Sequence, residues 1–78
     1  MSLPTRLDLR GLRCPLPALK TRKALSRLRP GDRIAVECTD PLAVIDIPHL
    51  IATTGDVLED TETADGVVTF VIRKADAA

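Results

Sequence analysis

Aromatic residues are almost absent from this chain of 78 residues. It contains no Trp or Tyr, and Phe70 is its single aromatic side chain. Proteins that bind single-stranded nucleic acid usually stack bases on aromatic rings, so this shortage argues against that class. The hydrophobic core must be built from Leu, Ile, Val and Ala, and a single domain is expected over residues 1–78.

Cysteine and histidine are also scarce. Cys14, Cys38 and His49 are the only residues of these two types. Two thiols and one imidazole fall short of the four ligands of a structural zinc site, and two cysteines do not build a disulfide scaffold. The sequence therefore predicts two free thiols, with no metal site and no cofactor.

Long hydrophobic runs are missing as well. No stretch approaches the roughly 18 consecutive apolar residues of a membrane helix. The first ten residues, "MSLPTRLDLR", carry no apolar segment after their basic residues, unlike a signal peptide. We expect a cytoplasmic protein with no membrane contact.

Charge is balanced overall but unevenly distributed. Residues 1–33 hold nine basic and two acidic residues, a net charge of +7, whereas residues 34–78 hold two basic and nine acidic residues, a net charge of −7. Such asymmetry suits an acidic partner or nucleic acid, although a solvated charged surface explains it equally well. An RNA- or ribosome-binding module that uses the basic N-terminal half is therefore an alternative hypothesis.

Hydrophobic periodicity predicts the order β-α-β-α-β-β. Alternation predicts a strand over residues 5–10 that ends at Gly11, and a helix follows from Pro15–Pro17 to Leu28, where "RPGD" stops it. A second strand over residues 33–39 turns Ile34, Val36 and Cys38 inward.

The second helix is predicted to begin with Asp40 as N-cap and Pro41 as its first residue, and to end near Gly55. Pro48 should kink it or restart it with Asp46 as a second cap. Two final strands, 56–64 and 66–74, meet at "ADG". The fold class is α+β: a two-layer α/β sandwich in which two helices cover one face of a four-stranded mixed sheet.

Cys14 lies where the first helix begins. The helix dipole, free N–H groups and the nearby Arg13 and Arg10 favour a thiolate, so we expect a pKa well below the free-cysteine value of about 8.5. Pro15 and Pro17 should hold the thiol outward on a stiff turn. The alternative is that Cys14 is a small hydrophobic residue at a strand–helix junction.

The chemistry open to this thiol is restricted by what surrounds it in sequence. A cysteine hydrolase needs a histidine base, for which His49 is only a weak candidate, and no Cys-x-x-Cys pair is present. A thiolate without base or resolving partner can still carry sulfur by thiol–persulfide exchange. Oxidation of Cys14 to a sulfenic acid, as a redox sensor, is a third hypothesis.

The outer side of the first helix carries leucines and cations. At about 100° per residue, the core side of the helix comprises Ala18, Thr21, Leu25 and Leu28. The opposite side comprises Leu16, Leu19, Lys20, Lys23 and Arg27. Together with Arg10, this second group is predicted to form a docking patch beside Cys14, although scattered exposed leucines are common on any surface.

Five stretches together resemble a known family. In order, "LDLRGLRCPLP", "RPGD", "TDP", "DIP" and "VIRK" extend from Leu7 to Lys74 and are similar to the small sulfur-carrier proteins called TusA, with their SirA and YedF relatives. The resemblance implies the βαβαββ sandwich, shared with the C-terminal domain of bacterial translation initiation factor three. It also implies a persulfide on the cysteine of the Cys-Pro-x-Pro signature, here Cys14, which we expect Gly11, Arg13, Pro15 and Pro17 to position.

The resemblance also implies partners. A pyridoxal-phosphate cysteine desulfurase or a rhodanese-like enzyme would supply the sulfur, and downstream relay proteins would receive it for tRNA thiolation, molybdenum cofactor synthesis or sulfur oxidation. The chain would then perform sulfurtransferase-type chemistry within a relay rather than act as an independent enzyme, with no direct contact to nucleic acid. Cys38 lies outside the signature and is expected to be inert core, or else to pair aberrantly with Cys14.

Overall fold

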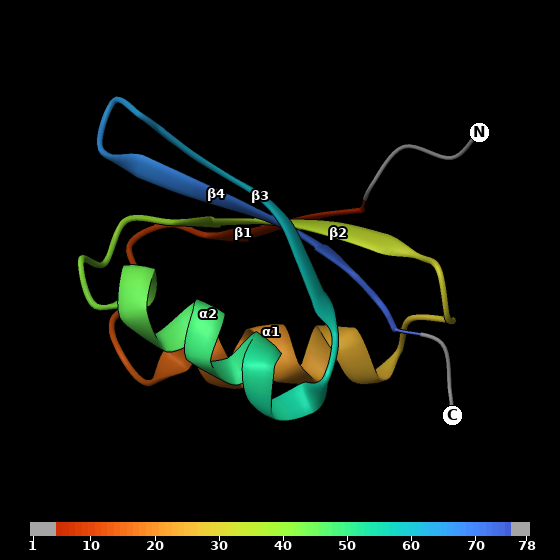
Figure 1. Cartoon of the computed structure of the whole chain (residues 1–78). Helices are drawn as coiled ribbons and strands as arrows, with labels where there is room; N and C mark the ends of the chain where they lie inside the picture. The colour runs from red at the N-terminus through yellow and green to blue at the C-terminus, as the bar shows by residue number, and fades with distance from the viewer. Residues whose placement is uncertain (1–4, 76–78) are drawn as a thin grey trace.

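The computed structural model describes residues 5–75 and has the predicted βαβαββ order. Its elements are β1 (Thr5–Leu9), α1 (Leu16–Ser26), β2 (Arg33–Cys38), α2 (Ala43–Thr54), β3 (Val57–Ala64) and β4 (Val67–Arg73). Both helices lie against one face of a four-stranded sheet (Figure 1), which confirms the predicted two-layer α+β sandwich. Within residues 5–75, neither helix is long and apolar enough to cross a membrane.

The sheet is mixed, with the spatial order β1-β2-β4-β3. β1 pairs in parallel with β2, whereas β4 pairs antiparallel with both β2 and β3. The register of the parallel pair places Leu9 opposite Cys38, so both strands end at the same edge of the sheet. The loops that follow β1 and β2 therefore meet there, and they carry the residues of the candidate site.

The core lies between the sheet and the helices. β2 turns Ile34, Val36 and Cys38 toward the helices, as alternation predicts, and Phe70 of β4 is fully buried opposite Val36. Burial of such a side chain contributes about 1.5–3 kcal/mol. The helices complete this core with Leu25, Ala43, Ile47 and Ile51.

α1 presents the predicted faces but ends earlier than Leu28. Thr21 and Leu25 are buried against the core, whereas Leu16 and Leu19 are exposed. The helix ends at Ser26 because the amides of Arg27 and Leu28 donate to the carbonyls three residues back, Ala24 and Leu25, each at 3.1 Å. This tightening of the last turn explains the difference.

α2 differs from the prediction at its start and at Pro48. It begins at Ala43 with Leu42 as N-cap, and Asp40 instead caps a preceding turn by accepting a 3.1 Å bond from the Leu42 amide. The helix continues through Pro48, so the predicted restart with Asp46 as a cap is wrong. Pro48 leaves only the carbonyl of Val44 without its helical donor, and Val44 is exposed, so water can satisfy it.

The β3–β4 hairpin turns at the predicted "ADG". Asp65 and Gly66 have φ values of 52° and 76°, which are the two consecutive positive values that a tight hairpin turn requires. A register shift between Leu58 and Asp60 marks a bulge in β3. β3 of this hairpin forms one edge of the sheet, at the opposite end of the strand order from β1.

Candidate functional site

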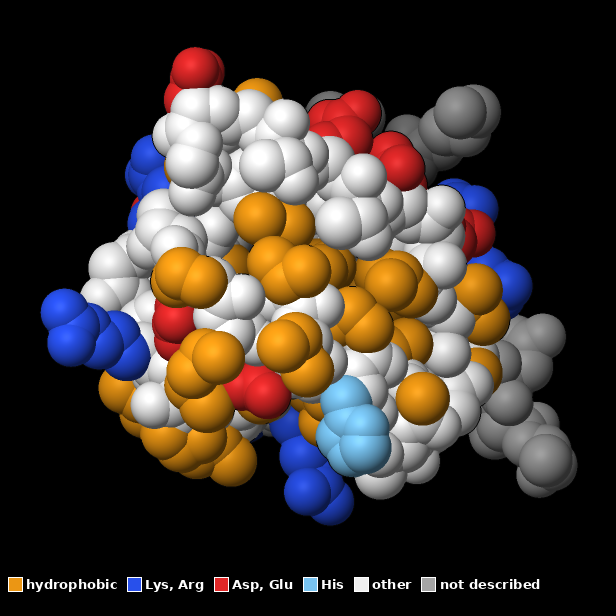
Figure 2. Space-filling view, turned by 60° about the vertical axis from the view of Figure 1, so that its left-hand side comes forward, with side chains coloured by type: hydrophobic (Ala, Val, Ile, Leu, Met, Phe, Trp, Pro, Cys, Tyr) orange, Lys and Arg blue, Asp and Glu red, His pale blue; other side chains and the backbone are white. Residues whose placement is uncertain are grey.

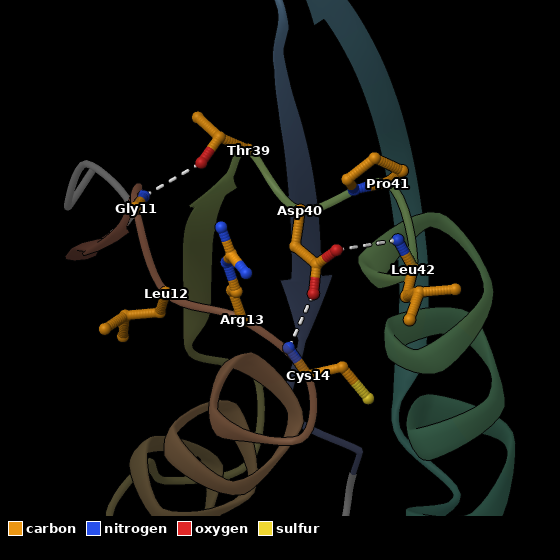
Figure 3. Close-up of a pocket in the computed structure, with 8 residues that line it drawn as sticks. All are labelled: Gly11, Leu12, Arg13, Cys14, Thr39, Asp40, Pro41 and Leu42. Atoms are coloured by element: carbon orange, nitrogen blue, oxygen red, sulfur yellow. Dashed lines mark hydrogen bonds between the residues drawn. The ribbon is translucent and has the colours of Figure 1, made fainter.

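Two loops build the site, one after each parallel strand. In the first, Gly11 has φ +84°, a conformation that favours glycine, and its amide donates to Thr39 Oγ1 at 2.8 Å. In the second, the two carboxylate oxygens of Asp40 accept from the backbone amides of Cys14 and Leu42 (Figure 3). Side chains of the second loop therefore hold the backbone of the first.

Cys14 lies on the first loop and is exposed, as predicted. Pro15 is the N-cap of α1, and Pro17 is buried near the helix start, so the turn that carries Cys14 is restricted on its C-terminal side. The Leu16 amide donates to the Arg13 carbonyl at 2.9 Å and closes this turn. The thiol is thus presented on a stiff segment.

Two hollows meet at Cys14. The first has a volume of about 620 Å³ and lies over the two loops; it is lined by Gly11, Leu12, Arg13, Cys14, Thr39, Asp40, Pro41 and Leu42. The second, of about 400 Å³, runs between α1 and α2; it is lined by Cys14, Pro15, Ala18, Asp46, His49, Leu50 and Thr53. Cys14 is therefore an exposed residue that lines both hollows.

The thiol of Cys14 donates a hydrogen bond to a carboxylate. Its Sγ lies 2.8 Å from Oδ2 of Asp46, which belongs to the first turn of α2. This bond, with smaller contributions from desolvation and the charges of Asp46 and Asp40, raises the pKa of Cys14 above its ordinary value. The prediction of a lowered pKa is therefore wrong, and the thiol form is favoured.

The features expected to favour a thiolate are engaged elsewhere. The Arg10 guanidinium binds Asp8 at 2.8 and 3.0 Å, and the Arg13 side chain extends in a different direction from the Cys14 sulfur (Figure 3). Pro15 and Pro17 have no backbone N–H that could donate a hydrogen bond to a thiolate. Helix position alone therefore does not decide the charge of this cysteine.

His49 and Cys38 do not take part in the bonding of Cys14. His49 lines the groove between the helices, but the thiol donates to Asp46. Cys38 is fully buried, and burial raises its pKa to about 11. Both cysteines are free, which confirms that prediction, and the burial of Cys38 supports its interpretation as inert core.

The predicted docking residues on α1 share one exposed surface. Leu16 and Leu19 are 44% and 56% exposed. In the part of the chain that the structure describes, Lys20, Lys23 and Arg27 form no ion pair, whereas Arg10 is bound to Asp8 and lowers the pKa of that carboxyl to about 2. The three free cations also line a shallow groove with Leu7 and Ala24.

α2 adds a second exposed hydrophobic group that sequence reasoning missed. Leu42, Val44 and Ile45 are 52%, 49% and 67% exposed, and Leu42 lines the same hollow as Cys14. One side of the molecule carries many such side chains close to acidic ones (Figure 2). Ala18 of α1 and Leu50 of α2 line the groove at Cys14, so hydrophobic residues of both helices belong to the surroundings of the thiol.

The RNA-binding hypothesis gains no support from the site. Phe70, the single aromatic residue, is fully buried in the core and is not available for base stacking. Between Thr5 and Ala75 no group of three or more His, Cys, Asp or Glu residues is placed to hold a metal ion.

Sequence reasoning also missed Thr39, Asp40 and Asp46 as site residues. The signal was present in the stretches "TDP" and "DIP", but their aspartates were interpreted only as helix caps and as part of the family resemblance. A physical signal was present too, because loops that follow adjacent parallel strands meet at one edge of a sheet. Acidic residues after the second strand were therefore candidates to contact Cys14.

Comparisons with known proteins agree on a single family. A family model described as "Sulfurtransferase TusA" matches residues 5–74. The Neisseria meningitidis serogroup A protein named "Putative sulfur carrier protein" is 43% identical over 67 residues, covering 86% of this chain and 90% of that protein. The sulfur carrier protein TusA of Allochromatium vinosum is 36% identical over 69 residues, covering 88% and 91%.

A solved structure shows the same fold. The SirA-like protein from Desulfitobacterium hafniense superimposes with a TM-score of 0.80, covering 92% of this chain and 99% of that one. At 23% sequence identity, this likeness concerns the fold alone.

Proposed function

Because this chain belongs to the TusA family and is a sulfur carrier, we propose that it holds sulfur as a persulfide on Cys14 and passes it to partner thiols. The observation that carries this proposal is the contrast between the two cysteines. Cys14 is exposed where two hollows meet, whereas Cys38 is fully buried and has a pKa near 11. Cys14 is thus the thiol that a partner protein can reach.

The exchange needs two balanced steps. In loading, the sulfur of Cys14 attacks the outer sulfur of a donor persulfide, the donor S–S bond breaks, and the proton of Cys14 passes to the departing donor thiolate. In delivery, the sulfur of an acceptor thiol attacks the outer sulfur of the Cys14 persulfide, the S–S bond to Cys14 breaks, and the proton of the acceptor thiol passes to the departing Cys14 thiolate. Neither step requires a base or second cysteine on this chain, which makes it a relay protein with sulfurtransferase-type chemistry.

The partners that we propose are those implied by the resemblance to the TusA family, and the charge of α1 is compatible with them. The donor is a cysteine desulfurase or a rhodanese-like enzyme, and the acceptor is a downstream relay protein of tRNA thiolation, molybdenum cofactor synthesis or sulfur oxidation. We place the exchange in the cytoplasm, where thiols stay reduced. The docking patch, consisting of Arg10, Leu16, Leu19, Lys20, Lys23 and Arg27, would receive the partner's surface. Lys20, Lys23 and Arg27, which form no ion pair within residues 5–75, favour an acidic partner surface.

Intact-mass measurement tests the proposal directly. The wild type and its Cys14→Ser and Cys38→Ser variants are incubated with cysteine and a cysteine desulfurase, then weighed without reductant. We expect the wild type and Cys38→Ser to gain one sulfur atom, which dithiothreitol removes, and Cys14→Ser to gain none. Sulfur gain by Cys14→Ser would contradict the assignment, as would the absence of gain with both desulfurase and rhodanese donors of verified activity.

A further inference from the structure

The carrier thiol is surrounded by carboxylates rather than by cations. Asp46 Oδ2 accepts the Cys14 Sγ–H at 2.8 Å, and Asp40 accepts the Cys14 backbone amide. The two carboxylates differ in their other contacts. Asp40 is also bound by the Leu42 amide, whereas within the described residues the Asp46 side chain accepts only from the thiol. Asp46 is therefore the acidic group most directly coupled to the proton on Cys14.

We propose, building on the carrier function above, that Asp46 keeps Cys14 protonated in the free protein until a docked partner brings a basic side chain to Asp46. A protonated thiol is a poor nucleophile, so the free carrier would resist unwanted alkylation and oxidation. A partner's Lys or Arg that pairs with Asp46 would weaken the S–H···O bond and favour the thiolate. Docking and activation would then coincide.

The charged groups around Cys14 support this role. Its own loop supplies Arg13, which extends away from the sulfur in Figure 3, and the β2–α2 loop supplies Asp40. α2 supplies Asp46 and His49, while the α1 side of the groove consists of the uncharged Pro15 and Ala18. No cation of residues 5–75 forms an ion pair with Asp46. A cation that pairs with Asp46 would therefore come from another protein.

The position of Asp46 in the helix explains why a negative charge is tolerated there. It lies in the first turn of α2, where the positive end of the helix dipole stabilises an ionised carboxylate. The hydrogen bond to Asp46 is the largest cause of the raised pKa of Cys14, and ionisation of the thiol would in addition place a second negative charge 2.8 Å from Asp46 Oδ2.

Alkylation kinetics test the role of Asp46 without any sulfur donor. Iodoacetamide is added to the wild type between about pH 6 and 10, and modification of the Cys14 peptide is followed by mass spectrometry. We expect the midpoint of the rate profile above the free-cysteine value of about 8.5. Asp46→Asn should lower the midpoint and raise the rate at pH 7 by roughly threefold or more. The larger thiolate fraction outweighs the lower nucleophilicity that accompanies a lower thiol pKa.

Asp60→Asn is the matched control. It removes the same charge from β3, on the sheet face opposite the helices, where Asp60 pairs with Val71, and it should behave as the wild type. Equal rates for Asp46→Asn and Asp60→Asn would overturn the proposal. If circular dichroism shows that Asp46→Asn is unfolded, the pH profile of the wild type still tests the proposal. A midpoint at or below about pH 8.5 would refute the role of Asp46.

A second experiment tests whether a docked partner weakens the hydrogen bond between Cys14 and Asp46. It also distinguishes failure of this proposal from failure of the carrier function. A desulfurase that loads Cys14 is inactivated by blocking its own catalytic cysteine and is then added during alkylation. It should accelerate modification of Cys14 in the wild type but not in Asp46→Asn; no acceleration would overturn the release step. Failure of sulfur gain beside a raised midpoint would contradict the carrier function while leaving the role of Asp46 intact.

Discussion

The backbone amide of Gly11 lies 2.8 Å from Thr39 Oγ1, and this hydrogen bond joins the loops that follow β1 and β2. The first loop carries Cys14 and the second carries Asp40, whose carboxylate binds the Cys14 amide. The parallel pairing of β1 and β2 brings these loops together although they are 28 residues apart. The position of the Cys14 thiol therefore depends on side chains outside the Cys-Pro-x-Pro signature.

Removal of the Thr39 hydroxyl should loosen the Cys14 loop. Thr39→Val keeps the shape of the side chain but loses the acceptor for the Gly11 amide, so the free energy of unfolding should fall by about 1 kcal/mol. Hydrogen exchange at the Gly11 amide should become faster. Thr39→Ser retains the hydroxyl and serves as the control; equal exchange rates in the two variants would show that this bond is not formed in solution.

Charge reversal on the docking patch should weaken donor binding without altering the thiol. Lys20→Glu and Lys23→Glu each remove a free cation of α1 and should raise the KM for this protein in a desulfurase assay by roughly tenfold at low salt. Arg22→Glu carries the same charge change on another side of the helix and should have a smaller effect. Iodoacetamide reactivity of Cys14 should be unchanged in all three, and a KM equal to that of Arg22→Glu would remove Lys20 and Lys23 from the patch.

Glu59 should stabilise the fold only when it is ionised. Its two oxygens accept from Arg33 Nε at 2.6 Å and from Arg73 Nε at 3.2 Å, and these arginines lie directly opposite each other on β2 and β4. The bond from Arg33, followed by that from Arg73, lowers the pKa of Glu59. The contribution is therefore present above the unfolded pKa of about 4.3 and is lost as the pH falls through the lower folded value.

Urea unfolding of the wild type and Glu59→Gln measures this contribution. The wild type should be more stable at pH 7, and the difference should shrink as the pH falls below about 4. Added salt should also reduce it, because the groups are partly exposed. If the difference in unfolding free energy between the two proteins stayed constant with pH, the charge of Glu59 would not contribute to stability.

Cys38 should make the protein sensitive to alkali. Its folded pKa of about 11 exceeds the unfolded value of about 8.5, so the folded state retains a proton that the unfolded chain has lost. The resulting stability is complete below about pH 8.5 and is lost as the pH rises toward 11, by up to about 3 kcal/mol. Cys38→Ala lacks this loss, so its stability relative to the wild type should improve over that range; a parallel decline of both proteins would show that other groups cause it.

Local patterns in the sequence predicted most of the fold because strand alternation and turn residues act over short distances. Ile34, Val36 and Cys38 turn inward as period two requires, and Asp65–Gly66 forms the turn that its residues favour. The effect of Pro48 was not predictable in this way. Pro48 removes a single helical donor, and the exposed position of Val44 makes that loss tolerable in a continuous helix.

The sequence by itself determined that Cys14 is the exposed thiol, because a proline on either side of Leu16 restricts the turn before α1, and that Cys38 is core, because it continues the inward face of β2. Only the tertiary structure decided the charge around Cys14. The nearest charges along the chain are Arg10 and Arg13, but Asp46, 32 residues away, accepts a hydrogen bond from the thiol. Electrostatic effects depend on distance in space, and the packing of α2 beside α1 sets that distance.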